Sequence, residues 1–95
     1  MSALDDMALL IVKEQELVIG PMAWSEAKKV AGLMVTERES VLIDQHAPDH
    51  KAVVDRLVMR YENLFGRASQ EVCRDAAAHI IASIPQSEVP TSLLR

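Results

Sequence analysis

Residues 16–27 read ELVIGPMAWSEA, and residues 62–73 read ENLFGRASQEVC. In each stretch apolar residues precede a glycine, which is Gly20 or Gly66. A segment that contains alanine and serine follows it. At the same offset of 46 residues, Ile11 pairs with Leu57 and Val12 with Val58. A pattern that returns at a fixed spacing is typical of duplicated structural units. The sequence therefore predicts two similar helical hairpins, each turning at its glycine.

The second half of the chain has the clearer helical pattern. Ala47, Pro48 and Asp49 have the composition of a helix start. Apolar residues then recur at steps of three and four, which indicates an amphipathic helix, and Pro85 would end a second run after Gly66. The first run contains Val54, Leu57, Val58, Tyr61, Leu64 and Phe65, and the second contains Ala68, Val72, Cys73, Ala76, Ala77, Ile80, Ile81 and Ile84.

The first half is ambiguous when it is read without the repeat. Residues 7–20 could form two short strands or one helix, because a short apolar run does not show its period. The repeat favours a helix that begins at Ser2, with Asp5 completing a capping box, and ends near Ile19. A second helix would follow Pro21. Its apolar stripe would contain Met22, Ala23, Ala27, Val30, Ala31 and Met34.

These patterns predict an all-α fold with one domain over residues 1–95. The two helix-Gly-helix hairpins, residues 2–46 and 47–95, would pack into a four-helix bundle, because neither can bury its apolar stripe alone. Residues 40–45 could be a helical turn or a strand, and by analogy with residues 87–95 we expect short capping helices in both places. A β-ribbon at residues 7–20 would contradict the duplication.

Composition narrows the classes of function. Of the 95 residues 49% are hydrophobic, and the formal net charge is −4 without long runs of one sign, which argues against a nucleic-acid partner. The chain has one cysteine, which fits a reducing compartment. No apolar run reaches membrane-spanning length, and Asp5 and Asp6 stand where a signal peptide would be basic. We therefore expect a cytoplasmic protein without a membrane partner.

The stretch around Gly20 resembles a small helical domain found near the C-terminus of bacterial signalling proteins such as serine/threonine kinases. The second copy lacks the proline of this motif, so the resemblance covers mainly the first hairpin. It implies an accessory or docking module and brings no catalytic residues. The matching residues are Leu17, Ile19, Gly20, Pro21, Met22 and Ala23, followed by Ala27, Lys28, Lys29 and Ala31.

The segment DQHAPDH, residues 44–50, contains the strongest candidate metal ligands. Asp44, His46, Asp49 and His50 could bind zinc or another divalent ion. The alternative is a polar loop between the repeats, in which Asp49 faces the start of a helix and the histidines are solvated. The spacing matches no familiar zinc signature, so the polar loop is favoured, and no cofactor is expected.

One pair of residues could carry nucleophilic catalysis. Cys73 could act as the nucleophile with His79 as its base, but six residues along one helix separate their directions. Cys73 also lies on the apolar stripe, where it is expected to be a buried hydrophobe. The chain has only three glycines, far apart, and so no phosphate-binding loop. We therefore predict that the protein is not an enzyme.

The two predicted hairpins differ at positions that could carry function. The first has apolar residues where the second has Asp55, Arg56, Gln70 and His79. This surplus predicts an exposed contact patch with Trp24 as its anchor, unless the segments around residues 42 and 93 cover it. The patch would consist of Leu9, Leu10, Trp24 and Leu33.

The sequence thus predicts a non-catalytic interaction or dimerisation module of a bacterial signalling protein, which binds another protein or a second copy of itself. The alternative is a small metal-binding protein that uses the loop from Asp44 to His50.

Overall fold

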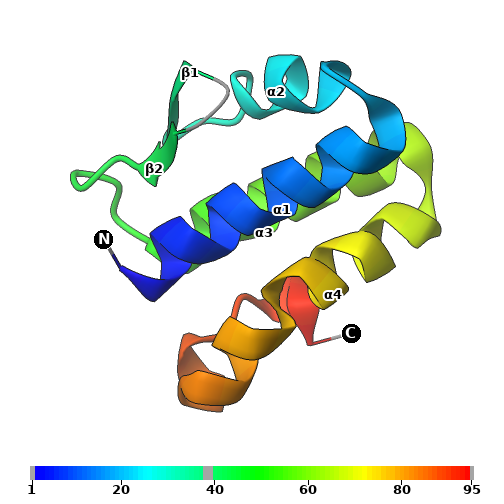
Figure 1. The fold of residues 1–95 in the computed structure, drawn as a ribbon. Helices are drawn as coiled ribbons and strands as arrows, with labels where there is room; N and C mark the ends of the chain where they lie inside the picture. The colour runs from blue at the N-terminus through cyan, green and yellow to red at the C-terminus, as the bar shows by residue number, and fades with distance from the viewer. Residues whose placement is uncertain (1, 38–39, 95) are drawn as a thin grey trace.

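The fold is mostly helical and includes one small sheet. The computed structural model describes residues 2–37 and 40–94 (Figure 1). These described residues form four α-helices and a two-stranded antiparallel sheet, followed by two short 3-10 helices. In chain order these are α1 (Ala3–Ile19), α2 (Met22–Ala27), β1 (Leu33–Glu37), β2 (Ser40–Ile43), α3 (His50–Phe65), α4 (Arg67–Ser83), η1 (Gln86–Glu88) and η2 (Thr91–Leu93).

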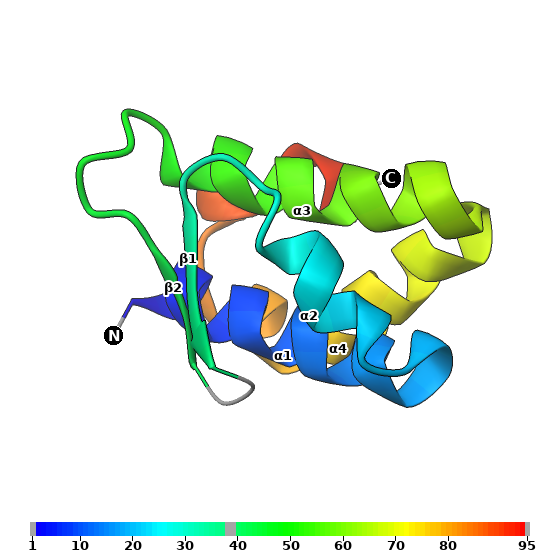
Figure 2. The same ribbon diagram turned by 90° about the horizontal axis from the view of Figure 1, so that it is seen from above.

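Helix α1 is the centre of the arrangement, in contact with α2, α3, α4 and β2. Helices α1 and α3 run in the same general direction, and α4 returns against them (Figures 1 and 2). The β-hairpin lies at the end where α1 and α3 begin, and the two helix corners lie at the opposite end. One face of α1 is buried in this packing and supplies Met7, Ala8, Ile11, Val12 and Gln15.

The repeated phrase corresponds to two corners of the same shape. Gly20 has φ 76° and ψ −161°, and Gly66 has φ 91° and ψ −178°. This region of backbone space is accessible almost only to glycine. Each glycine N–H donates to the carbonyl four residues earlier, at 2.9 Å for Glu16 and 2.8 Å for Glu62. The predicted turns at Gly20 and Gly66 are therefore confirmed, and residues 7–19 form a helix.

The hairpin of α3 and α4 is confirmed as predicted. Helix α3 begins at His50, two residues after Pro48, because the Asp49 carboxylate caps the helix and Pro48 stays outside it. Four residues of the predicted stripe of α3, Val54, Leu57, Val58 and Tyr61, are fully buried.

The prediction for residues 28–45 is wrong. Helix α2 ends at Ala27, and residues 33–37 and 40–43 pair as antiparallel strands, with Leu33 opposite Ile43 and Val35 opposite Val41; the predicted positions 38 and 39 lie outside the described residues. No helical stripe continues through Val30 and Met34, and residues 40–43 are a strand instead of a capping helix. The reason lies in the residue types, since valine, threonine and isoleucine fit a pleated surface better than a helix.

The C-terminal tail closes the core through short 3-10 turns. Val89 and Leu93 are buried. The Asp55 carboxylate accepts hydrogen bonds from the Ser92 N–H at 2.9 Å and from the Ser92 hydroxyl at 2.6 Å. Gln70 Nε2 donates to the Ser92 carbonyl at 2.7 Å. The tail therefore covers α3 and α4, and the short 3-10 helices η1 and η2 lie where short capping helices are predicted.

Asp5 joins the start of α1 to the β-hairpin. It completes the predicted capping box with Ser2, and its Oδ1 accepts the Ile43 N–H at 2.8 Å. Burial alone would raise the pKa of Asp5. The hydrogen bonds from the backbone N–H groups of Ile43 and Ser2 outweigh it, so the pKa lies below the ordinary value of 3.8. The carboxylate is thus held in its charged form.

We expect Asp5→Asn to lower the free energy of unfolding by about 1–2 kcal/mol at pH 6, since a charged acceptor becomes a neutral one. Because the folded pKa of Asp5 is depressed, its contribution is complete above the unfolded-state pKa. It disappears as the pH falls through the folded pKa. The difference in urea unfolding between the variant and the unmodified chain should therefore be largest at pH 6 and should decrease as the pH is lowered toward 2.5. Asp6→Asn is the matched control, and an equal loss in both variants would contradict the prediction.

Candidate functional site

Two of the four predicted metal ligands in the 44–50 loop, Asp44 and Asp49, accept local backbone hydrogen bonds. The Asp44 carboxylate accepts the His46 N–H at 2.9 Å. Asp49 caps α3 by accepting the N–H groups of Lys51 and Ala52, at 3.0 and 3.3 Å. Within residues 2–37 and 40–94, no group of three or more histidine, cysteine or acidic side chains is placed to hold a metal ion. The alternative in which Asp49 faces the start of a helix is confirmed.

Cys73 is buried in the core, where substrate has no access to it. Its side chain is fully buried, and Gln15 Nε2 lies 3.3 Å from its sulfur. Burial raises the pKa of the thiol to about 11, although the hydrogen bond from Gln15 opposes this shift. His79 is exposed on the same helix. This geometry gives no support to a Cys73–His79 catalytic pair.

The contact patch predicted from the hairpin comparison does not form on the surface. Trp24 is 3% exposed and Leu33 is 8% exposed, so both belong to the core. Leu9 is partly buried and packs against that core, which leaves Leu10 as the one exposed member of the four. Trp24 is buried because α2 packs on α1 and α3, and Leu33 because β1 pairs with β2 beside α1.

The structure instead exposes a different set of apolar residues on α1. Leu10 is 38% exposed, and Leu17, seven residues further on, is 79% exposed. Seven residues make nearly two turns, so the two side chains lie within about 20° of each other around the axis. Asp6 and Lys13 lie on one side of this pair, and Glu14 lies on the other. We call this surface, Leu10 and Leu17 with Asp6, Lys13 and Glu14, the α1 face.

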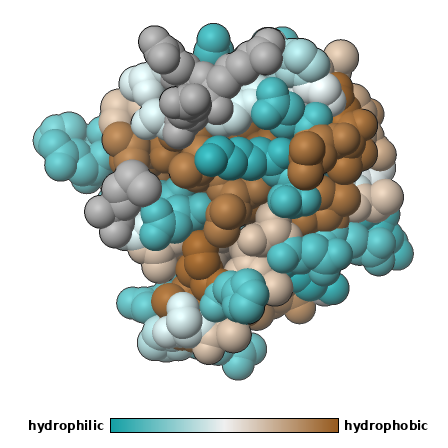
Figure 3. Space-filling view, in the orientation of Figure 1, coloured by the Kyte–Doolittle hydropathy of each residue, from teal (hydrophilic) through white to brown (hydrophobic). Residues whose placement is uncertain are grey.

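The apolar part of this surface continues around the first corner. Val18 is 62% exposed, and Met22, the first residue of α2, is 49% exposed. In the space-filling view, hydrophobic side chains gather over α1 and the α1–α2 corner, interrupted by hydrophilic ones (Figure 3). Elsewhere in the described part of the chain, the large exposed hydrophobic residues are Met34, Met59, Leu64, Phe65 and Leu94.

Sequence reasoning missed Leu17 as a surface residue, although a signal for it was present. Ala8, Ile11, Val12 and Gln15 follow the i, i+3, i+4, i+7 spacing of one helix face. Leu17 falls on the opposite side of that helix. A wheel of residues 3–19 would therefore have separated the core stripe from a second, smaller apolar stripe.

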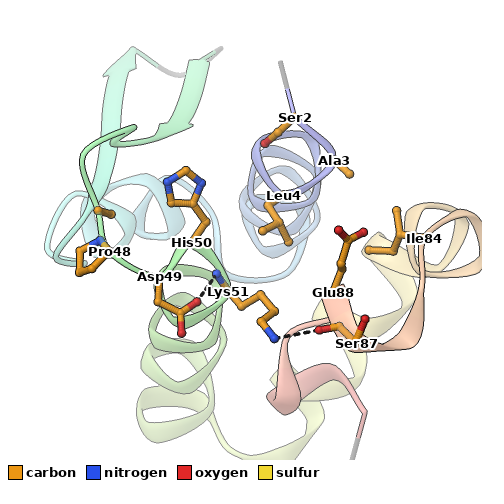
Figure 4. Close-up of a pocket in the computed structure, with 11 residues that line it drawn as sticks. Ser2, Ala3, Leu4, Pro48, Asp49, His50, Lys51, Ile84, Ser87 and Glu88 are labelled. Atoms are coloured by element: carbon orange, nitrogen blue, oxygen red, sulfur yellow. Dashed lines mark hydrogen bonds between the residues drawn. The ribbon is translucent and has the colours of Figure 1, made fainter.

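An open hollow lies at the other end of the molecule, where α1 and α3 begin next to η1 (Figure 4). It is an open depression of about 520 Å³, lined partly by Leu4, Ile84 and Glu88. Lys51 extends across it and donates from Nζ to the Ser87 carbonyl at 2.8 Å. The Lys51 ammonium group therefore holds the C-terminal tail. The described residues that line the depression are not arranged as in a catalytic site.

The basic side chains between α2 and α3 have structural partners. Arg60 forms an ion pair with Glu26 at 2.7 Å, and Lys29 approaches the same carboxylate at 3.4 Å. Hydrogen bonding from Arg60 lowers the pKa of Glu26, against the effect of burial. Arg56 donates to the Ala31 carbonyl at 3.0 Å. These contacts fasten α2 and the following turn to α3.

Comparison with known proteins gives no family: no protein-family model, curated protein or solved structure matches the chain. The resemblance to the helical domain of bacterial signalling proteins therefore stays a prediction. Among the described helices, none is both long and apolar enough to cross a bilayer.

Proposed function

We propose that this chain is a non-catalytic protein-binding module that uses the α1 face. The observation that carries the proposal is the exposure of Leu17, which is 79%, in line with Leu10 on a helix whose other face is the centre of the core. Burying a leucine side chain stabilises a complex by about 1.5–3 kcal/mol relative to leaving it in water. An apolar stripe bordered by charges is the usual form of a protein contact surface.

The state of the candidate catalytic groups supports the non-catalytic part of the proposal. Cys73 is buried and its thiol is held protonated by a raised pKa. Asp44 and Asp49 accept backbone hydrogen bonds, which accounts for their positions without a metal ion. The metal-binding alternative gains no support from this geometry. A role in bacterial signalling is part of the proposal only through the sequence resemblance.

Site-specific photocrosslinking tests the proposal and does not require the partner to be identified beforehand. A benzophenone amino acid replaces Leu17 in the full chain, which is expressed in the cells it comes from. Ala78, which is exposed on α4, is replaced in the same way as a matched control. We expect a covalent protein adduct of defined mass from position 17 and none from position 78. The absence of an adduct at position 17, or equal adducts from both positions, would contradict the proposal.

A further inference from the structure

We propose that the occupant of the α1 face is the α1 face of a second copy of this chain, with the two α1 helices antiparallel. This inference rests on the proposed function and names its partner. Three features of α1 carry it: the spacing of its exposed apolar residues, the distribution of charge beside them, and the size of the residue at its first turn.

The apolar residues on this side of α1 are spaced for self-pairing. Ala3, Leu10 and Leu17 follow one another at intervals of seven residues. A two-fold axis at the level of Leu10, perpendicular to the helix, places Leu10 against the partner's Leu10. It also places Leu17 of each copy against Ala3 of the other copy, so that this contact occurs twice. The small alanine leaves room for the leucine, as in the large-to-small packing of antiparallel helices.

The charges beside the stripe agree with the same arrangement. In an antiparallel pair related by this axis, each side of one helix meets the same side of the other. Asp6 and Lys13 lie on one side of α1, about 40° and 60° from Leu10. Asp6 of one chain therefore comes level, within about 1.5 Å along the axis, with Lys13 of the partner subunit. The pair forms twice in the dimer, and no ion pair within the described chain competes for either group.

The parallel arrangement explains less of the surface. It would place Lys13 beside the partner's Glu14 and would leave Asp6 without an opposite charge. It would also align the dipoles of the two helices, whereas the antiparallel pair opposes them. Antiparallel pairing uses both Asp6 and Lys13, and we therefore favour it.

The affinity should be modest. One side of a 17-residue helix is smaller than the contact area of a typical stable complex. We expect a dissociation constant on the order of 10–100 µM, weaker at high salt because the ion pairs are at the rim of the contact.

Sedimentation equilibrium of the full chain, from about 5 µM to about 1 mM, measures this affinity directly. We expect Leu17→Asp to weaken dimerisation at least about tenfold, because it places a carboxylate in the apolar stripe of the contact. Met59→Asp on α3 is the matched control, since Met59 is 46% exposed and lies outside the α1 face. Lys13→Asp should weaken the dimer, and adding Asp6→Lys should restore it. Restoration by Glu14→Lys instead would overturn the antiparallel arrangement.

Engineered disulfides test the orientation independently. The native Cys73 is buried and does not interfere. In an antiparallel dimer Leu10→Cys should form a disulfide-linked dimer under mild oxidation, and Leu17→Cys should not, because its partner is Ala3. A linked dimer of Leu17→Cys as efficient as that of Leu10→Cys would show a parallel pair and overturn the proposal.

The outcomes also separate this inference from the proposed function. A chain that stays monomeric at about 1 mM overturns self-pairing. If position 17 then still gives a photocrosslink to a different protein, the α1 face is a binding surface with another occupant. If it gives none, the proposed function fails as well. A photocrosslinked adduct with twice the mass of the chain supports both.

Discussion

Replacing Tyr61 by alanine is expected to lower the free energy of unfolding by about 3–5 kcal/mol, and replacing it by phenylalanine by about 1–2 kcal/mol. The tyrosine is fully buried, and its hydroxyl donates to the Ala23 carbonyl at 2.7 Å. Burial raises the pKa of Tyr61 above its ordinary value of 10, so the hydroxyl keeps its proton and acts as a donor over the physiological range. Alanine removes the ring and the hydrogen bond, whereas phenylalanine removes only the bond.

The loss from Tyr61→Phe should be concentrated in α2. This helix has six residues, too few to be stable without tertiary contacts. The Tyr61 hydroxyl and the Arg60–Glu26 ion pair are polar contacts that tie it to α3. We therefore expect the amides of residues 22–27 to exchange with solvent faster in the phenylalanine variant, and those of α4 to change less.

Urea unfolding of Tyr61→Ala and Tyr61→Phe measures the loss in the free energy of unfolding. Hydrogen exchange of Tyr61→Phe shows which helix is destabilised. Met59→Ala is the control on the exposed side of α3, where a substitution should cost less than about 0.5 kcal/mol. A phenylalanine variant as stable as the unmodified chain would show that the hydroxyl contributes nothing to the position of α2.

The sequence predicts α1, α3 and α4 well because their apolar spacing is continuous over many turns. Val54, Leu57, Val58 and Tyr61 are buried as the stripe requires. The predicted apolar stripe of α3 includes two residues that are not buried. Leu64 and Phe65, at the end of the helix next to the corner, are 50% and 36% exposed. Periodicity thus identifies which side of a helix faces inward, but tertiary packing decides how far along the helix burial extends.

The β-hairpin is not predicted by the repeat, because the repeat describes only the helices and their corners. Residues 41–43 show the alternating burial of a strand, with Val41 and Ile43 buried and Leu42 between them partly exposed. The density of β-branched residues there is a local signal for strands. Alignment with the second half of the chain nevertheless predicts a helix for residues 41–43. The pairing of residues 33–37 with residues 40–43 depends on contacts between strands, which a helical repeat does not contain.

The prediction that Trp24 and Leu33 are exposed is wrong for a related reason. The hairpin comparison predicts an exposed Trp24 because Gln70, its counterpart at the repeat offset, is polar. Gln70 is in fact buried as well, at 6% exposure, and its amide is satisfied by the Ser92 carbonyl. Leu10 is exposed, as is its counterpart Arg56. Polarity at one position therefore does not report exposure at the other, because a hydrogen-bonded amide can occupy the core.

Trp24→Ala is expected to lower the free energy of unfolding by about 3–5 kcal/mol, which makes it a test of the fold more than of the interface. Trp24→Phe should change it by less than about 1 kcal/mol, because two effects of similar size oppose each other. The smaller ring leaves a cavity. It also removes the indole N–H, which is buried and has no hydrogen-bond partner among the described residues. Unfolding is followed by circular dichroism, since the variants lack tryptophan fluorescence.

Comparison of Trp24→Phe with Tyr61→Phe shows whether side-chain volume or hydrogen bonding decides which substitution lowers the free energy of unfolding more. Trp24→Phe deletes more volume than Tyr61→Phe, so packing alone would make it the costlier change. The hydrogen bonds give the opposite order, because the Tyr61 hydroxyl has a partner and the Trp24 N–H has none within residues 2–37 and 40–94. Sedimentation of Trp24→Phe should match that of the unmodified chain. Weaker association at unchanged stability would mean that Trp24 reaches the interface, contrary to its burial.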